Sequence, residues 1–334
     1  TEIKYNEIST AEGVLLGFKP NTHSKPHHTA GYIVTRNDGA RYIYGEALYN
    51  THKEEVTFAV EGRAHNNATG IVTYSSALLD NTLKNDLGDK YYDRIITGPY
   101  AHTYLLTCLL SSDYSDADNI PGPSEKDFGS YTLFKYSDPE IYNWRTPCGS
   151  NTANYNEGLT TDSEDDKGSY IYGKKEQKYL ERIETKTHIA IFYTSDRDDA
   201  LGVVGENGQV SNSQRVQKLD RIALYSKGEY YLPGTTTPDP NAVPIKEAHF
   251  EYDYSLCPGV PNSVNGGGKL TLKRVFFTYR NSEMGRYSDY EFTYGDVNHD
   301  GFTELERNPS YNLKGYDIWG NYKPNNGTTN TNPL

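Results

Sequence analysis

The stretch from residue 296 to residue 306 has the residue types and spacing of a calcium-binding loop. Oxygen-bearing side chains recur at alternate positions, and Gly301 follows where such a loop makes its sharp turn. The candidate ligands are Asp296, Asn298, Asp300, Glu304 and Glu306. Arg307 stands where a helix–loop–helix site has its bidentate Glu, so we expect a shorter calcium-stapled turn between strands. Its role would be structural, and the alternative is an acidic turn without an ion.

Other clusters of polar residues point less clearly to chemistry. The acidic loops Asp113–Asp118 and Asp162–Asp166 could add weak cation binding, but a solvated loop is the simpler interpretation. His23, His27 and His28 lack a neighbouring acid or Cys to complete a ligand set, so we expect an exposed loop. The sequence contains no Gly-x-Ser-x-Gly, His-Glu-x-x-His or phosphate-binding loop, and we therefore expect no enzyme activity.

Two tryptophans could bind a ligand by stacking. Exposed Trp144 and Trp319 would be the anchors of a carbohydrate-binding surface, since aromatic rings stack on sugar rings. The competing interpretation is that aromatic residues at strand period belong to the core.

Composition indicates that strands carry these residues. The 334 residues include 31 Tyr, against 10 Phe and 2 Trp, and a Tyr ring packs on a pleated sheet while its hydroxyl stays wet. A single Met and the absence of long Ala, Leu, Glu or Lys runs argue against a helical bundle. We predict an all-β, mainly antiparallel fold with at most one or two short helices.

Charge and cysteine content limit the partners. A formal net charge of −12 would repel nucleic acid and anionic membranes alike, and no run approaches the ~20 apolar residues of a membrane-spanning helix. We therefore expect neither nucleic-acid binding nor membrane insertion, and a soluble piece of something longer. Cys108, Cys148 and Cys257 are far apart in sequence, which favours free thiols, with one long-range disulfide as the alternative.

Local patterns place the first elements within an N-terminal β region, residues 1–100. Two β-rich runs meet at Asn37-Asp38-Gly39 and predict a hairpin over residues 31–45, with positive φ at both turn residues, Asp38 and Gly39, and a second strand ending at Gly45. Val56–Val60 reads as another strand. Leucines at helical spacing predict a short helix over residues 76–87.

A repeated pattern occupies residues 101–295. Four segments share Leu-x-x-apolar: Leu105–Cys108, Leu180–Ile183, Leu219–Ile222 and Leu272–Val275. The last three read Leu-charged-Arg-β-branched. Each precedes an aromatic strand: Leu133–Tyr136, Ile189–Tyr193, His249–Tyr252 and Tyr290–Tyr294. All but Ile189–Tyr193 end in Phe-x-Tyr. Such a strand pair cannot bury its apolar face alone, so we predict that the pairs stack into one extended or curved sheet.

These motifs resemble a known family. The run Asp38-Gly-x-Arg-Tyr42-x-Tyr44-Gly45, the repeated strand pairs and Tyr316-Asp-x-x-Gly320-x-Tyr322 are similar to the RHS or YD-repeat family of large secreted bacterial proteins. The likeness covers most of residues 31–322 and is closest to the lead-in to the repeats of giant surface proteins that resemble type IX secretion cargo. The chain departs from the family in having one Tyr-Asp-x-x-Gly copy, followed by Asn321-Tyr322.

The resemblance implies a β shell that encloses or presents cargo at the cell surface. Its partners would be the rest of a larger polypeptide or the secretion machinery. Residues 296–322 would then hold the calcium-like turn and the Tyr-Asp motif, and residues 323–334 would be a disordered tail. We expect a non-catalytic extracellular scaffold or passenger. The alternatives are a module that binds glycan or another surface partner and, third, a glycoside-active enzyme.

Overall fold

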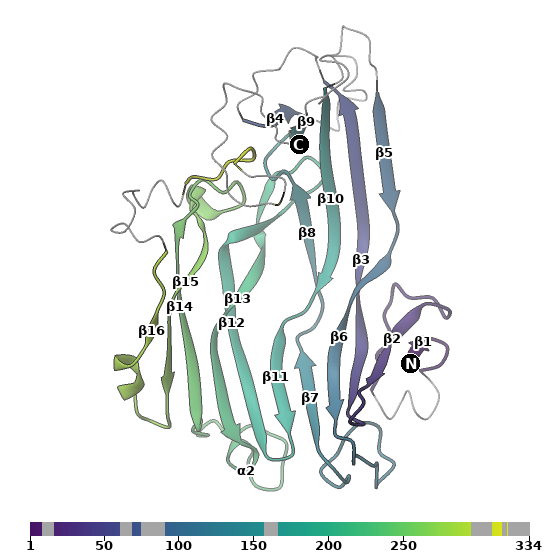
Figure 1. The fold of residues 1–334 in the computed structure, drawn as a ribbon, viewed down its shortest axis with the longest axis vertical. Helices are drawn as coiled ribbons and strands as arrows, with labels where there is room; N and C mark the ends of the chain where they lie inside the picture. The colour runs from purple at the N-terminus through teal and green to yellow at the C-terminus, as the bar shows by residue number, and fades with distance from the viewer. Residues whose placement is uncertain are drawn as a thin grey trace.

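One antiparallel sheet of sixteen strands dominates the protein (Figure 1). The structure, a computed structural model, describes residues 1–8, 17–60, 69–74, 91–156, 166–294, 309–315 and 319. The strands are β1 (Glu2–Lys4), β2 (Thr29–Thr35), β3 (Arg41–Ala59), β4 (Ile71–Thr73), β5 (Tyr92–Thr97), β6 (Tyr100–Leu110), β7 (Tyr131–Tyr136), β8 (Glu140–Thr146), β9 (Thr152–Asn156), β10 (Lys167–Gln177), β11 (Leu180–Thr185), β12 (His188–Val203), β13 (Val210–Ser226), β14 (Lys246–Leu256), β15 (Lys269–Thr278) and β16 (Tyr290–Glu291). The helical elements of this part of the chain are α2 (Lys227–Tyr230), η2 (Val264–Gly266) and η3 (Met284–Tyr287). The predicted all-β, antiparallel class is confirmed.

The sheet is open, with β4 and β16 at the two ends of its path. From β16 back to β11 the strands follow in chain order, then β7, β6 and β3 continue the sheet, and β10, β9 and β4 complete it. β3 is central because β5 and β6 pair along one of its sides, and β2 and β10 along the other. β1 joins β2, and β8 joins β10. Among the described residues, no helix is long and apolar enough to cross a membrane.

β2 and β3 form a hairpin over residues 31–45, but its details differ from the prediction. Gly39 takes positive φ at 86°, whereas Asp38 does not and instead accepts the Ala40 N–H through its side chain. The second strand continues past Gly45 to Ala59. Gly45 serves close packing here, because a Cβ at this position would lie 2.7 Å from the Thr107 hydroxyl oxygen.

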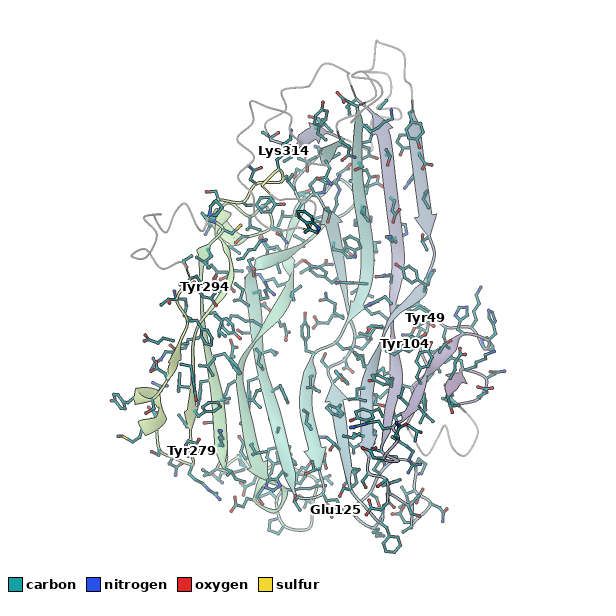
Figure 2. The ribbon with its side chains drawn as sticks, in the orientation of Figure 1. Tyr49, Tyr104, Glu125, Tyr279, Tyr294 and Lys314 are labelled. Carbon is teal, nitrogen blue, oxygen red and sulfur yellow. The ribbon has the colours of Figure 1, made fainter. Side chains whose placement is uncertain are left out.

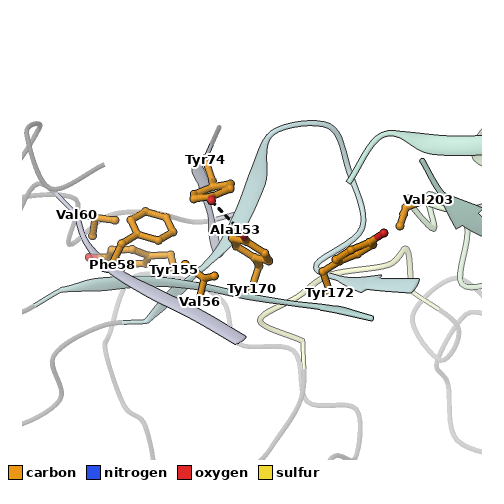
Figure 3. Packing of buried hydrophobic residues seen from close by; sticks show 9 residues of the cluster. All are labelled: Val56, Phe58, Val60, Tyr74, Ala153, Tyr155, Tyr170, Tyr172 and Val203. Carbon is orange, nitrogen blue, oxygen red and sulfur yellow. Dashed lines mark hydrogen bonds between the residues drawn. The ribbon is translucent and has the colours of Figure 1, made fainter. Parts of the chain in front are cut away.

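Two buried clusters anchor the half of the sheet around β3. One contains Phe18, Ala30, Ile33, Ile43, Cys108, Leu110 and Tyr131. The other, drawn in Figure 3, contains Val56, Phe58, Val60, Tyr74, Ala153, Tyr155, Tyr170, Tyr172 and Val203. In this second cluster the Tyr74 and Tyr170 hydroxyl oxygens lie 2.9 Å apart, and Tyr170 donates to the buried carboxylate of Glu54 at 2.8 Å. The three cysteines are free thiols, and burial raises the pKa of Cys108 to about 12.

In the other half of the sheet, the strands β13 and β14 are thinly covered. Most side chains of β13 are half-buried whichever face they occupy, and no residue of β14 is fully buried. A strand with a second layer packed on it would alternate between buried and exposed positions. These two strands therefore form a single layer whose two faces are both partly exposed to solvent.

Candidate functional site

Several positions predicted to carry function lie outside the described residues. These are Asp296, Asn298, Asp300, Glu304 and Glu306 of the calcium-like turn, the Tyr316-Asp317 pair, the tail at residues 323–334 and the expected helix at residues 76–87.

The two tryptophans occupy different environments. Trp144 lies on β8 with its indole packed over Gly173 of β10, where a Cβ would come within 2.7 Å of the ring. Its indole N–H is buried and has no hydrogen-bond partner. Trp319 is 78% exposed. Of the two predicted stacking residues, Trp319 has the accessibility that a ligand would need.

The loop between β6 and β7 gathers three carboxylates. Asp116 and Asp118, from the predicted acidic loop, bring carboxylate oxygens within 4.8 Å of Asp127, which the sequence analysis missed. Burial alone would raise the pKa of Asp127, but the N–H groups of Ser124 and Ala117 donate to its carboxylate and hold the pKa below its usual range. The Ser124-x-x-Asp127 spacing, typical of a side-chain cap, is a signal in the sequence that could have identified it. The cluster could accept a cation, but its hydrogen bonds already account for the loop.

A cavity of about 330 Å³ lies beside β8 and β12. The buried guanidinium of Arg145 borders it and stacks 4.3 Å from the centre of the Tyr170 ring. Asp199 is held by two hydrogen bonds from Arg197, and burial raises the pKa of the Cys148 thiol. The cavity lining therefore offers no thiolate and no uncommitted carboxylate base, which a nucleophilic site would need.

The strongest structural pattern is the pairing of the repeated strands. Each Leu-x-x-apolar strand lies beside the aromatic strand that follows it, as predicted: β6 with β7, β11 with β12, β13 with β14, and β15 with β16. The residue before each Phe occupies one fixed position in these pairs, opposite the motif Arg or its equivalent. The opposed residues are Leu133 and Cys108, Ile191 and Arg182, His249 and Arg221, and Glu291 and Arg274.

The register between consecutive pairs is also constant. The Phe of one aromatic strand opposes the β-branched residue of the next Leu-charged-Arg strand: Phe134 and Ile183, Phe192 and Ile222, Phe250 and Val275. In every case the ladder skips the charged residue of the motif, which is Glu181, Asp220 or Lys273. A skipped residue of this kind is a β-bulge, which bends the strand and increases its twist. The Leu-charged-Arg-β-branched motif is thus the sequence form of a recurring bulge.

The first unit follows the same rule after a correction of one residue. Tyr44 of β3 opposes Leu106, Thr107 is skipped, and Ile43 opposes Cys108. The motif equivalent is therefore Leu106–Leu109, and not Leu105–Cys108 as predicted. The sequence prediction failed here because Leu stands at both 105 and 106, so that only the hydrogen-bonded register settles the phase.

A tyrosine hydroxyl closes three of the four units. Each hydroxyl donates to the carbonyl of the Leu that precedes the bulge: Tyr136 to Leu106 at 2.9 Å, Tyr252 to Leu219 at 2.8 Å, and Tyr294 to Leu272 at 2.8 Å. In β12 the order is Phe192-Tyr193-Thr194, so Thr194 occupies the place of the Tyr, opposite Leu219. β12, the aromatic strand without Phe-x-Tyr, therefore has no tyrosine at the position from which the other three strands donate to the Leu carbonyl.

Comparison with known proteins adds no relative. No protein-family model matches the sequence, and no curated protein matches it.

Loss of one tyrosine hydroxyl should weaken the sheet measurably. Tyr252→Phe is expected to lower the free energy of unfolding by ~1 kcal/mol, because the Leu219 carbonyl loses its donor in a half-buried setting. Urea denaturation monitored by circular dichroism gives the value. Tyr287→Phe, at an exposed ring, is the matched control and should change little. Equal effects of the two substitutions would contradict a structural role for the repeated hydroxyl.

Proposed function

We propose that this chain is a non-catalytic scaffold built from repeated strand pairs. The main observation in support is that four successive units share the same bulged register, and three of them share the same tyrosine-to-leucine hydrogen bond. Repeat architectures in which each unit contacts its neighbours extend a surface by adding units, and their loops vary without disturbing the sheet. The long polar loops between these strands fit that plan.

The particular scaffold is a segment of a secreted RHS-like surface protein, whose sheet forms part of a wall that encloses or presents cargo. The single layer at β13 and β14 supports this, because a wall has two faces and no second layer. The net charge of −12 suits an extracellular protein that must not adhere to nucleic acid or anionic lipid.

The proposal is tested on the full-length protein recovered from the producing cells. After limited proteolysis, the sheet and the polypeptide that it encloses or presents should remain together on native size-exclusion chromatography and separate in denaturant. This chain alone is the control for fragments that associate without specificity. Separation under native conditions would contradict the scaffold role.

The sequence of the calcium-like turn adds a prediction on metal binding. Calcium should raise the midpoint of thermal unfolding, and each kcal/mol of binding corresponds to a shift of ~2–4 °C for a domain of ~150–250 residues. Asp296→Asn with Asp300→Asn should abolish this rise and change nothing in chelator. Asp116→Asn with Asp118→Asn, in the other acidic cluster, is the matched control and should retain the calcium response. A loss for the 296/300 variant that is equal in chelator would contradict calcium binding at this turn.

A further inference from the structure

The sheet ends at β16 with apolar side chains exposed. Among the described residues β16 pairs with β15 alone, and it lies at one side of the sheet in Figure 1. Tyr290 is 62% exposed and Phe292 is 39% exposed, whereas the equivalent Phe134, Phe192 and Phe250 are half-buried between two strands. Figure 2 labels Tyr279 and Tyr294 at this end of the sheet.

The inner side of β16 obeys the repeat register. Glu291 opposes Arg274, as the residue before Phe does in the other units, and the Phe292 N–H donates to the Lys273 carbonyl at 2.9 Å. Backbone N–H groups of successive strand residues point to opposite sides. The Glu291 N–H is therefore directed away from β15, toward the side that another strand would occupy.

The interior units define what belongs on that side. The outer neighbour of β7, β12 and β14 is in every case a Leu-charged-Arg-β-branched strand, with its Ile or Val opposite the Phe. β16 carries the same inner half of the pattern. An antiparallel strand of that sequence would cover Phe292 with its β-branched side chain and provide an acceptor for the Glu291 N–H.

We propose that the β16 edge is the acceptor for one further Leu-charged-Arg-Ile/Val strand, supplied by the next repeat unit of the parent protein. This inference rests on the proposed scaffold function, because an added strand continues the same wall. Within this chain, Leu305-Glu-Arg-Asn308 has Asn where the pattern requires Ile or Val, and it lies outside the described residues.

The test uses the full chain and a synthetic peptide of its own residues 177–187, which contain Leu180-Glu-Arg-Ile183. A control peptide carries Asp in place of Leu180 and Ile183. Binding is followed by fluorescence anisotropy of the labelled peptide and by hydrogen–deuterium exchange at the Glu291 amide. The motif peptide should slow this exchange at least tenfold at saturation, and the control peptide should bind at least tenfold more weakly.

A matched pair of chain variants locates the site. Glu291→Pro removes the outward N–H and should abolish binding, whereas the strand itself should persist because proline is tolerated on an edge strand where its missing donor faces solvent. Glu291→Thr keeps the donor and should bind like the unmodified chain. Circular dichroism of both variants establishes that the sheet is intact.

Four outcomes of the peptide-binding experiment overturn the proposal. The first three are absence of binding, equal binding of the two peptides, and equal binding by the Pro and Thr variants. The fourth is binding that is seen only after Leu305→Asp with Arg307→Asp, because the chain's own segment would then be what fills the edge. Sedimentation should show a monomer, and self-association lost in the Pro variant would assign the edge to a second copy instead. The scaffold proposal fails by a separate result, which is separation of the sheet from its cargo on native size-exclusion chromatography.

Discussion

Deletion of Ala223 from β13 is expected to unfold the surrounding sheet, whereas deletion of Asp220, three residues earlier, should be tolerated. Ala223 has 0% of its surface exposed and is opposed by Ile191 on one side and Glu247 on the other. Its loss forces a slip of one residue, which moves every side chain beyond it to the other face of the sheet. We expect the free energy of unfolding to fall by ~4–5 kcal/mol or more.

Asp220 is the skipped residue of the bulge, so its removal leaves the pairs on both sides in place. Leu219 remains opposite Thr194, and Arg221 remains opposite Tyr193, now in a regular ladder. The lost ion pair with Lys218 is partly exposed and contributes ~1 kcal/mol at most. Urea denaturation of the two single-residue deletions compares them directly. Equal destabilisation would show that the bulge is not an added residue in an otherwise continuous ladder.

Acidification is expected to remove most of the stability of the fold. Five carboxylates buried in the sheet and its loops have pKa values below their ordinary ones: Glu46, Glu54, Asp127, Glu184 and Asp199. Burial alone would raise each pKa, but hydrogen bonds and ion pairs outweigh it. At Glu54, which is 1% exposed, these come from Arg94 at 2.9 Å and Tyr170 at 2.8 Å.

The sign of the pH dependence follows from these directions. In the folded protein the carboxylates bind fewer protons than in the unfolded chain, whose pKa values are ~4, so their stabilisation is fully present above about pH 5. It is lost as the pH falls below ~4 and through the folded pKa values. Thermal unfolding at constant ionic strength should therefore show a midpoint that falls steeply from pH 5 to pH 3.

A matched pair of variants assigns part of this effect to Glu54. Glu54→Gln should be less stable at neutral pH and should show a shallower fall, because one titrating group has been removed. Glu125→Gln, at an exposed side chain, is the control and should leave the fall of the unfolding midpoint unchanged. A midpoint that stays flat between pH 6 and pH 3 would contradict the assignment of lowered pKa values to these buried groups.

The repeated strands were the part of the fold that sequence could predict. Leu219-Asp-Arg-Ile222 and His249-Phe-Glu-Tyr252 carry their own pattern, so both the strands and their adjacency follow from it. The bulge did not follow, because a charged residue such as Asp220 is equally compatible with a solvent-facing position in a regular strand. It becomes visible when Leu219 and Arg221 are seen opposite adjacent residues of β12.

Contacts between residues far apart in the sequence could not be predicted for a different reason. β10 pairs with β3 across more than a hundred residues, and no local pattern records that choice. Trp144 has the sequence context of an exposed platform, yet Gly173 on the neighbouring strand leaves space that the indole fills. Asp127 meets Asp116 because the loop folds back on itself, which the spacing of the acidic run does not show.

One register repeats through the sheet, and cysteines placed at opposed positions can detect it by forming disulfides. Three double variants place Cys at the Phe and β-branched positions that face each other: Phe134 with Ile183, Phe192 with Ile222, and Phe250 with Val275. Directly opposed residues have Cβ atoms ~4.5–5.5 Å apart, close enough for a disulfide after a small adjustment. Under mild oxidation, mass spectrometry of proteolytic fragments should find all three cross-links, and none in a control that moves Cys from Ile222 to Ala223. Cross-linking of the shifted control, or failure of any of the three pairs, would contradict the repeated register.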